Sequence, residues 1–161
     1  MGSAARRAAD EVIVERLMSD PRLLDAKSVG LYLPMETEPS IDEVVEFLFD
    51  RGVTVCVPVL RGDDLIMTSI DADTQWGINS YGIAEPISGE VIADADVYIV
   101  PMVAYHGKDR LGHGKGYFDR YLADKKGYRI GVAYACQRAD FDVQAHDVPM
   151  DKVITEEEIC E

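Results

Sequence analysis

The stretch RLGHGKGYFDRYL, residues 110–122, places three glycines at alternate positions directly before an aromatic, helix-like run. Glycine lets backbone amides approach a ligand closely and adopt positive φ. The start of the following helix adds free N–H groups. Arg110 offers a planar fork and Lys115 a point charge for phosphate oxygens. We therefore interpret this loop as a cradle for an anion, with phosphate as its natural guest.

The spacing of the loop matches neither of two common nucleotide-binding motifs. Gly116 follows Lys115 where the Walker A motif requires Ser or Thr, and Tyr117 stands where a dinucleotide fingerprint has its third glycine. An ordinary glycine-rich turn is the alternative interpretation. Asp119, in the first turn of the expected helix, suits either a complement to the helix dipole or a Mg²⁺ ligand beside phosphates.

The distribution of charge favours a confined anion site. The chain has a formal net charge of −14, which argues against nucleic acid as a partner because phosphate neutralisation supplies most of that binding. Residues 108–129 nevertheless hold seven basic and three acidic residues. A basic island in an acidic protein focuses a small anion rather than a broad polyanion.

Length and composition indicate a single domain over residues 1–161, with 47% hydrophobic and 29% charged residues. Residues 1–3, MGS, have the look of a cloning remnant. The apolar run at 97–105 is far shorter than the roughly 20 residues that cross a bilayer, so we expect no membrane partner. No assembly element is visible, and we expect a monomer.

Three cysteines, Cys56, Cys136 and Cys160, lie far apart without C-x-x-C spacing. That spacing argues against a disulfide framework and against a cysteine zinc site. We therefore expect a protein of the reducing cytoplasm. Cys56 lies inside an apolar run, which predicts a buried packing role.

Six apolar, β-branched runs bounded by turn residues predict buried strands, and helical patterns lie before or between them. The predicted strands cover residues 28–34, 53–60, 64–70, 97–103, 128–134 and 152–155. The predicted helices cover residues 4–18, 40–52 and 117–127. Strands that are apolar on both faces and alternate with helices indicate an α/β fold with a largely parallel sheet covered on each side.

Capping and proline residues locate the ends of these elements. Ser40 is expected as the N-cap of the second helix, with Glu43 as its capping-box partner, while Gly52 and Gly127 are expected to close the second and third helices. Three predicted strands end at prolines, namely Pro34, Pro58 and Pro101. Ligands of open α/β sheets bind outside the carboxyl ends of the strands, so we expect the segments after these prolines to share one rim.

The loop RLGHGKGYFDRYL resembles the signature of the 5-formyltetrahydrofolate cyclo-ligase family, also called methenyltetrahydrofolate synthetases. Four further segments resemble that family in the same order along the chain. They are LYLPMETE at 31–38, YGIAEP at 81–86, VPMVAY at 100–105 and HDVPMDKVITE at 146–156. The combination is far more specific than any one segment.

The resemblance implies a Mg²⁺- and ATP-dependent enzyme that converts 5-formyltetrahydrofolate to 5,10-methenyltetrahydrofolate and releases ADP and phosphate. It also implies a three-layer α/β/α, Rossmann-like fold, similar to the NagB/RpiA/CoA-transferase-like fold. In such enzymes the ATP γ-phosphate is thought to phosphorylate the formyl oxygen, after which N10 of the folate attacks the formyl carbon. Positioning and charge neutralisation dominate phosphoryl transfer of this kind.

The resemblance also implies roles for individual residues. Catalytic roles fall to Arg110, Lys115 and Tyr117. The ATP-binding residues are Arg110, Leu111, Gly112, His113, Gly114, Lys115, Gly116, Tyr117 and Phe118. The folate-binding residues are Leu33, Glu38, Tyr81, Tyr117 and Phe118. Asp119 and Asp147 are the implied Mg²⁺ ligands.

Two departures from the family pattern keep an alternative open. No lysine precedes Lys27, so only Arg6 and Arg7 could replace the family's usual N-terminal lysine, and Ser40 and Ile41 replace its usual acidic residue and threonine. The alternative is a nucleotide- or folate-binding relative without cyclo-ligase turnover. A third hypothesis is another reaction on the same scaffold, such as sugar-phosphate isomerisation or acyl transfer to coenzyme A, but no nucleophile or base in the sequence supports it.

The three histidines are not interpreted as catalytic bases. His106 is expected to be exposed on a loop, and His113 occupies a variable position between two glycines. His146 is expected to form structural hydrogen bonds, while its neighbour Asp147 reaches the magnesium.

Overall fold

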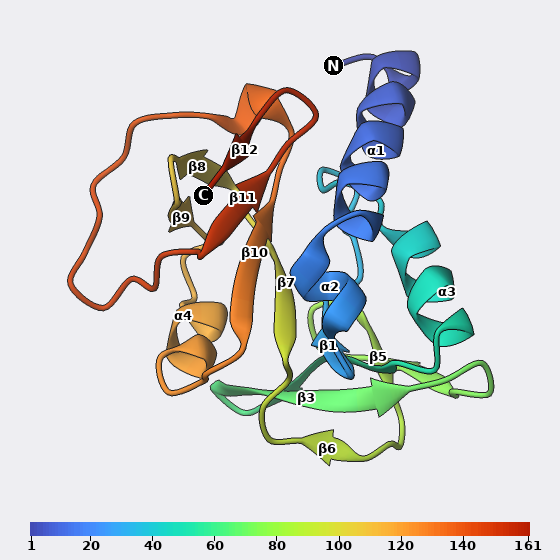
Figure 1. The fold of residues 1–161 in the computed structure, drawn as a ribbon. Helices are drawn as coiled ribbons and strands as arrows, with labels where there is room; N and C mark the ends of the chain where they lie inside the picture. The colour runs from blue at the N-terminus through green and yellow to red at the C-terminus, as the bar shows by residue number, and fades with distance from the viewer.

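Eight strands form the central sheet of the computed structural model, which describes residues 1–161. In chain order they are β1 (Ser28–Gly30), β2 (Thr54–Arg61), β3 (Asp64–Ile70), β6 (Val91–Ile92), β7 (Val97–Pro101), β10 (Tyr128–Val132), β11 (Lys152–Ile154) and β12 (Ile159–Cys160). Their spatial order is β12-β11-β10-β7-β1-β2-β3-β6 (Figure 1). The five strands from β11 to β2 are parallel, while β12, β3 and β6 run antiparallel to their neighbours.

Helices cover both faces of this sheet. Those of one face are α1 (Ser3–Met18), α2 (Pro21–Asp25) and α3 (Asp42–Asp50), and the short α4 (Tyr117–Leu122) lies on the other (Figure 1). The two faces bury separate hydrophobic clusters, the larger one beneath α1, α2 and α3. The predicted α/β fold with a largely parallel, two-sided sheet is thereby confirmed.

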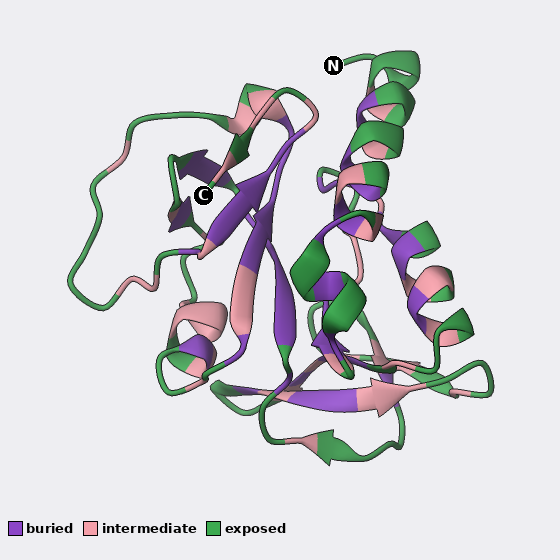
Figure 2. Cartoon of the chain, in the orientation of Figure 1, coloured by how far each residue is buried: buried purple, intermediate pink, exposed green.

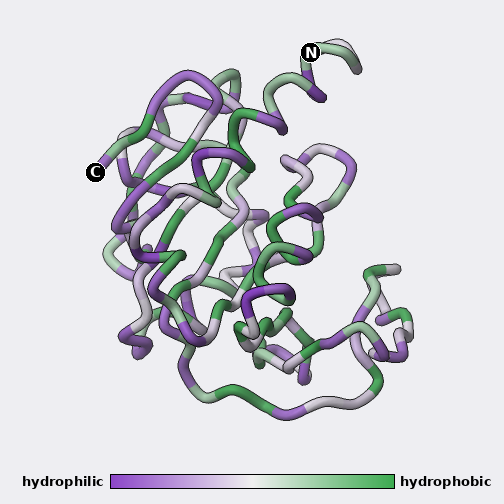
Figure 3. Tube along the Cα trace, turned by 45° about the vertical axis from the view of Figure 1, so that its right-hand side comes forward, coloured by the Kyte–Doolittle hydropathy of each residue, from purple (hydrophilic) through white to green (hydrophobic).

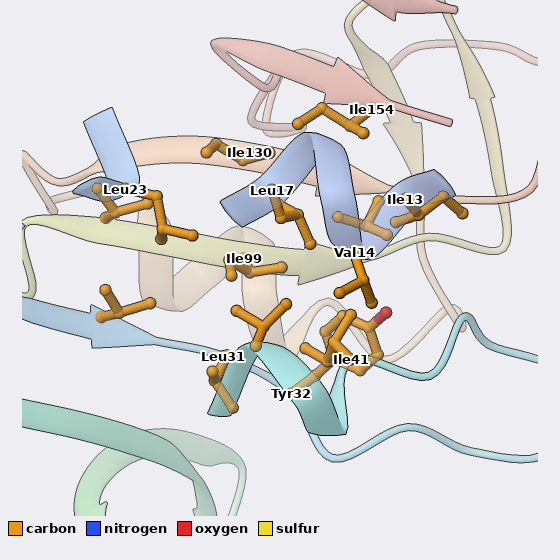
Figure 4. Packing of buried hydrophobic residues seen from close by; sticks show 14 of the residues in the cluster. Ile13, Val14, Leu17, Leu23, Leu31, Tyr32, Ile41, Ile99, Ile130 and Ile154 are labelled. Carbon is orange, nitrogen blue, oxygen red and sulfur yellow. The ribbon is translucent and has the colours of Figure 1, made fainter. Parts of the chain in front are cut away.

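The larger cluster joins α1 to the middle of the sheet. Ile13 and Leu17 of α1 are fully buried and belong to the same cluster as Ile99, Ile130 and Ile154, which lie on β7, β10 and β11 (Figure 4). Each such side chain contributes about 1.5–3 kcal/mol through burial. The strands beneath α1 are almost continuously buried (Figure 2), which explains why they read as unbroken apolar runs in the sequence.

Two small hairpins stand outside the central sheet. One pairs β4 (Trp76–Ile78) with β5 (Ala84–Pro86), and the other pairs β8 (Ala104–His106) with β9 (Asp109–Leu111). A short 3₁₀ helix, η1 (Ala135–Gln137), follows β10. The sequence analysis predicted none of these elements, nor α2, β6 or β12. Their segments are short and carry little hydrophobic periodicity, whereas the main strands are strongly hydrophobic in Figure 3.

Two of the predicted helix ends are wrong. Ser40 does not cap α3, because Ile41 occupies the N-cap position without a side-chain cap, while the Ser40 amide donates to Asp10 Oδ1 at 3.3 Å. The third predicted helix ends at Leu122 rather than at Gly127. Gly127 is required for close packing instead, since a Cβ atom there would lie 2.2 Å from the Ala95 carbonyl oxygen.

The predicted C-terminal end of α3 is confirmed. Gly52 has φ +73°, and its amide bonds the Phe49 carbonyl while the Val53 amide bonds the Leu48 carbonyl. This is the complete Schellman arrangement, in which glycine adopts the left-handed conformation without steric cost.

The prolines occupy three different positions relative to the strands. Pro101 is the last residue of β7, Pro34 lies beyond β1, and Pro58 lies inside β2 rather than at its end. Cys56 directs its carbonyl toward β1, where it accepts from the Leu31 amide, and Pro58 has the same orientation two residues later. Because β1 has ended at that level, the missing Pro58 amide costs the sheet no hydrogen bond.

None of the helices combines the length and the apolar character that crossing a membrane requires.

Burial of several weak acids predicts that stability falls at alkaline pH. Burial raises the pKa of Cys56, Tyr121 and Tyr134 to about 12, and raises that of Tyr32 and Tyr98 beyond the ordinary range. The unfolded chain therefore loses these protons at lower pH than the folded protein. The contribution of these groups to the free energy of unfolding should be complete below about pH 9 and should decrease as the pH rises toward 12.

Urea denaturation at pH 8 and pH 11 measures this loss. Cys56→Ala removes one of the groups, so that variant should lose about 2 kcal/mol less than the wild type over the same interval. Equal losses in the two proteins would show that Cys56 does not contribute to the alkaline transition.

Candidate active site

A cleft of about 670 Å³ lies at the carboxyl ends of β1, β2 and β7, where the sequence placed the ligand rim. Every residue predicted to bind or react lines this one cleft. They are Leu33, Glu38, Tyr81, Arg110, Leu111, Gly112, His113, Gly114, Lys115, Gly116, Tyr117, Phe118, Asp119 and Asp147. The fold thus brings together four segments that are separated by up to 114 residues of chain (Leu33 to Asp147).

Arg110 lines the cleft and is buried. Its side chain is only 6% exposed, and its Nε donates to the Pro101 carbonyl at 2.7 Å. The guanidinium lies 5.3 Å from the centre of the Phe118 ring, and its Nη1 lies 3.9 Å from Asp119 Oδ1. These contacts fix the plane of the guanidinium at the junction of β7, β9 and α4.

The charge of Arg110 is buried and incompletely balanced. Burial lowers the pKa of Arg110 from its ordinary value, and the carboxylates of Asp119, Glu38 and Asp147 oppose that shift. An arginine with an ordinary pKa above 12 keeps its proton near neutral pH. A buried cation with a single ion-pair contact as long as 3.9 Å favours an anionic ligand that completes its environment.

Glycine is required at several positions of the loop for different reasons. A Cβ atom on Gly112 would lie 3.0 Å and 3.1 Å from the two Nη atoms of Arg110. Gly114 and Gly116 have φ of +92° and +71°, a region that side chains disfavour. The alternating glycines therefore accommodate the buried arginine and also turn the backbone into the cleft.

The helix after the loop is shorter than predicted. α4 has six residues, and Gly116 occupies its N-cap position without a side-chain cap. So short a helix has a small dipole, and binding of an anion by this loop would depend on Arg110, Lys115 and the glycine backbone.

Arg120 is a functional candidate that the sequence analysis missed. Its Nη1 donates to the Lys115 carbonyl and its Nη2 to the Asp63 carbonyl, each at 2.7 Å, and the guanidinium lies over the Tyr117 ring. Arg120 therefore clamps the glycine loop to the turn between β2 and β3. The position of Arg120 inside the loop motif could have indicated a functional role, but the sequence alone does not show where its side chain points.

Glu38 also lines the cleft, next to His113 of the glycine loop, and is 5% exposed. Its Oε1 accepts the Met35 amide at 2.8 Å, and its Oε2 lies 3.7 Å from His113 Nε2. Oε1 thus stabilises the turn at residues 35–38, and Oε2 faces His113 of the glycine loop.

Asp119 and Asp147 lie on the same side of the cleft. Asp119 Oδ1 accepts the Val148 amide at 3.1 Å, and Asp147 Oδ2 accepts the Gln144 amide at 2.8 Å. No group of three or more His, Cys, Asp or Glu residues could hold a metal by itself. Two carboxylates with free oxygens nevertheless fit Mg²⁺, which takes one or two carboxylates together with substrate phosphates and water.

The aromatic residues predicted to contact the folate, Tyr81, Tyr117 and Phe118, come from two segments of the chain. Tyr81, which is 55% exposed, lies on the loop between β4 and β5, and its hydroxyl is 3.3 Å from the Tyr117 hydroxyl of α4. That contact is the largest cause of the raised pKa of Tyr117. Asn79 and Glu85 also line the cleft and escaped the sequence analysis, although Glu85 lies within the YGIAEP segment.

Arg6 and Arg7 do not line the cleft. Arg6 donates to the Glu36 carbonyl and lies over the Tyr134 ring, 5.6 Å from its centre. Tyr134 in turn donates to Asp10 at 2.6 Å. The N-terminal helix thus contacts the loop that carries Glu38 and does not contribute a basic side chain to the cleft.

The histidines lie largely as predicted. His106 is half-exposed outside the cleft, 2.6 Å from Asp140. The structural hydrogen bonds predicted for His146 are absent, because its imidazole is well exposed and approaches only Asp147 Oδ1, at 3.6 Å from Nε2, although it lines the cleft. Buried Cys56 has the predicted packing role, and all three cysteines are free.

The fold and the cleft define an α/β protein with a basic, glycine-rich loop at the carboxyl ends of its parallel strands. A family model for the 5-formyltetrahydrofolate cyclo-ligase family matches residues 1–156. The chain belongs to this family, and the enzyme is a ligase, as the resemblance of its motifs predicted.

Individual relatives agree with this assignment. A 5-formyltetrahydrofolate cyclo-ligase of Mycoplasma genitalium is 33% identical over 80% of this chain and 72% of its own length. The cyclo-ligase of Escherichia coli K12 is 28% identical over 91% of this chain and 87% of its own length.

Solved structures agree as well. The 5,10-methenyltetrahydrofolate synthetase of Aquifex aeolicus matches with a TM-score of 0.88 and 30% identity, covering 99% of this chain and 84% of that one. The synthetase of Mycoplasma pneumoniae, at 24% identity, has the same fold with a TM-score of 0.79 and covers 97% of this chain and 90% of that one.

The clamp formed by Arg120 predicts a measurable effect on anion binding. Lysine keeps the charge but cannot donate to two carbonyls with the geometry of a guanidinium. Arg120→Lys should weaken binding of inorganic triphosphate about tenfold, as measured by isothermal titration calorimetry, because the Lys115 backbone is no longer fixed.

Arg51→Lys is a matched control, since Arg51 also donates to a main-chain carbonyl and lies over an aromatic ring, but outside the cleft. Unchanged triphosphate binding in Arg120→Lys would show that the loop keeps its shape without the clamp.

Proposed function

We propose that this enzyme converts 5-formyltetrahydrofolate to 5,10-methenyltetrahydrofolate with ATP and Mg²⁺, releasing ADP and phosphate. The observation that carries the proposal is the buried, underbalanced Arg110 guanidinium beside the glycine loop, with the Glu38 carboxylate facing that loop across the cleft. The glycine loop with Arg110 suits phosphates, and the Glu38 carboxylate suits the hydrogen-bond donors of a folate.

The chemistry asks mainly for positioning and charge neutralisation. A formamide oxygen is a poor leaving group, and transfer of the γ-phosphoryl group from ATP to this oxygen converts it into a phosphate ester. N10 then attacks the activated carbon, the C–O bond breaks, inorganic phosphate leaves, and N10 releases its proton. Arg110 and Lys115 neutralise charge on the transferred phosphoryl group, and we assign the Tyr117 hydroxyl to orient it.

The folate is held by the walls around Glu38. Glu38 Oε2 accepts hydrogen bonds from the pterin, because Oε1 is already occupied by the Met35 amide. Leu33 lines the apolar side, and Tyr81, Tyr117 and Phe118 offer flat surfaces on which the pterin ring can stack. Leu111, Gly112, His113, Gly114 and Gly116 surround the ATP phosphates with their backbone.

Asp119 and Asp147 would hold Mg²⁺ through the carboxylate oxygens that their amide contacts leave free. Bound there, the ion would neutralise charge on the ATP phosphates. We also propose that the protein works as a single-domain monomer in the cytoplasm, in line with its three free cysteines.

One observation favours a second candidate, a nucleotide- or folate-binding relative without turnover. The basic residues of α1 do not line the cleft, and Arg6 is engaged with Glu36 and Tyr134. If the family reaction needs a cation from this helix, the site would bind ligands without completing the transfer.

The decisive experiment follows the near-ultraviolet absorbance of the methenyl product. Purified protein with 5-formyltetrahydrofolate, ATP and Mg²⁺ should form product, and omission of ATP should abolish it. Folded protein that binds ATP but forms no product would support the binding-only relative and overturn the proposed activity.

Two substitutions should separate the two walls of the cleft. Lys115→Ala should raise the KM for ATP about tenfold or more, because a charge-assisted contact to phosphate is lost. Glu38→Gln should raise the KM for the folate with little change in the KM for ATP. Steady-state kinetics with each substrate varied in turn measures both effects.

An unchanged ATP dependence in Lys115→Ala would contradict the phosphate cradle. Equal damage to both KM values in Glu38→Gln would mean that Glu38 supports the loop rather than the folate.

A further inference from the structure

The hairpin of β4 and β5 carries Tyr81 to the cleft, although it lies outside the central sheet. The hairpin is inserted between β3 and β6 and pairs only with itself, through Trp76–Pro86, Gly77–Glu85 and Ile78–Ala84. Its loop nevertheless lines the cleft with Asn79, Tyr81 and Ile83. Something other than strand pairing must therefore fix this loop relative to the sheet.

Within the hairpin, the side chain of Asn79 organises the loop. Its Oδ1 accepts the Tyr81 amide at 2.9 Å and the Ile83 amide at 3.1 Å. The backbone closes the same turn, because the Asn79 amide donates to the Ile83 carbonyl and the Gly82 amide donates to the Asn79 carbonyl. The conformation of Tyr81 is thus set by Asn79.

Glu85 joins this loop to the sheet. Its Oε2 accepts the Leu60 amide of β2 at 2.7 Å and the Asn79 side-chain amide at 3.0 Å. Leu60 lies four residues after Cys56, so its amide points in the direction in which the Cys56 carbonyl meets β1. β1 ends at Gly30, and the Glu85 carboxylate supplies the partner that the strand no longer provides.

A continuous chain of polar contacts therefore runs from β2 to Tyr117 on α4. It passes from the Leu60 amide through Glu85 and Asn79 to the Tyr81 backbone, and the Tyr81 hydroxyl then meets the Tyr117 hydroxyl at 3.3 Å. Tyr81 is thus held both at its backbone amide and at its hydroxyl.

We propose that Glu85, acting through Asn79, is the positioning residue that holds Tyr81 over the folate-binding part of the cleft. The inference rests on the proposed function, in which Tyr81 contacts the pterin. Glu85 need not touch the reacting atoms or the ATP phosphates. Its loss therefore affects folate binding and leaves ATP binding intact.

The test compares Glu85→Ala and Glu85→Gln with the wild type. Glu85→Ala should raise the KM and the Kd for 5-formyltetrahydrofolate about tenfold, with the KM for ATP within about twofold, since one charge-assisted anchor is lost. The amide oxygen of glutamine still accepts the Leu60 amide, so Glu85→Gln should restore most of the affinity. Glu90→Ala is the matched control, because the Glu90 side chain is exposed and outside the cleft.

Intrinsic fluorescence gives an independent readout of the hairpin. Trp76 is the only tryptophan of the chain, lies on β4 and is 43% exposed. Its emission should shift to longer wavelength in Glu85→Ala without ligand, and should match the wild type in Glu85→Gln and Glu90→Ala.

The proposal is overturned if Glu85→Ala leaves the folate constants unchanged, raises both KM values equally, or is no worse than Glu85→Gln. Folate Kd values, measured by calorimetry without ATP, separate this result from the proposed function. If the wild type binds the folate without turnover, the proposed activity fails, and the Kd ratio still decides the role of Glu85. A wild type that does not bind the folate overturns both.

Discussion

The early end of β1 is the constraint on which the site depends. β1 lies between β7 and β2 in the sheet and stops at Gly30, while both neighbours continue. Main-chain groups at this edge then need partners other than a strand. Side chains supply them, since Arg110 donates to the Pro101 carbonyl and Glu85 accepts the Leu60 amide. The cleft occupies the space into which a longer β1 would extend.

Burial of Arg110 follows from this geometry and dictates its surroundings. The guanidinium that donates to the Pro101 carbonyl also packs against Gly112, where a Cβ atom would lie 3.0 Å from Nη1 and force the guanidinium to shift. Its charge draws Asp119 to 3.9 Å, with Glu38 and Asp147 also within electrostatic range. These carboxylates offset only part of the cost of burying the cation, and an anionic ligand in the cleft would complete its environment.

The long apolar runs predicted the parallel strands, and the family segments predicted site residues that all line the cleft. Both are local signals in the sequence. It could not predict the hairpin with Tyr81, whose short strands lack periodicity, or the role of Arg120, whose two carbonyl partners lie far apart in the chain. Ser40 illustrates a different limit. It is a good capping residue, but it does not cap α3, and its amide donates to Asp10 of another helix. Local propensity is overridden wherever a tertiary partner satisfies the same group.

The glycine loop and the start of α4 form one continuous segment. Arg110 and Lys115, which we assign to the phosphates, are joined through Gly116 to Tyr117 and Phe118, which also line the cleft. An anion that fixes the loop also fixes the first turn of α4, including the Tyr117 hydroxyl that meets Tyr81. Under the proposed function, nucleotide and folate would therefore contact one continuous segment rather than two independent sites.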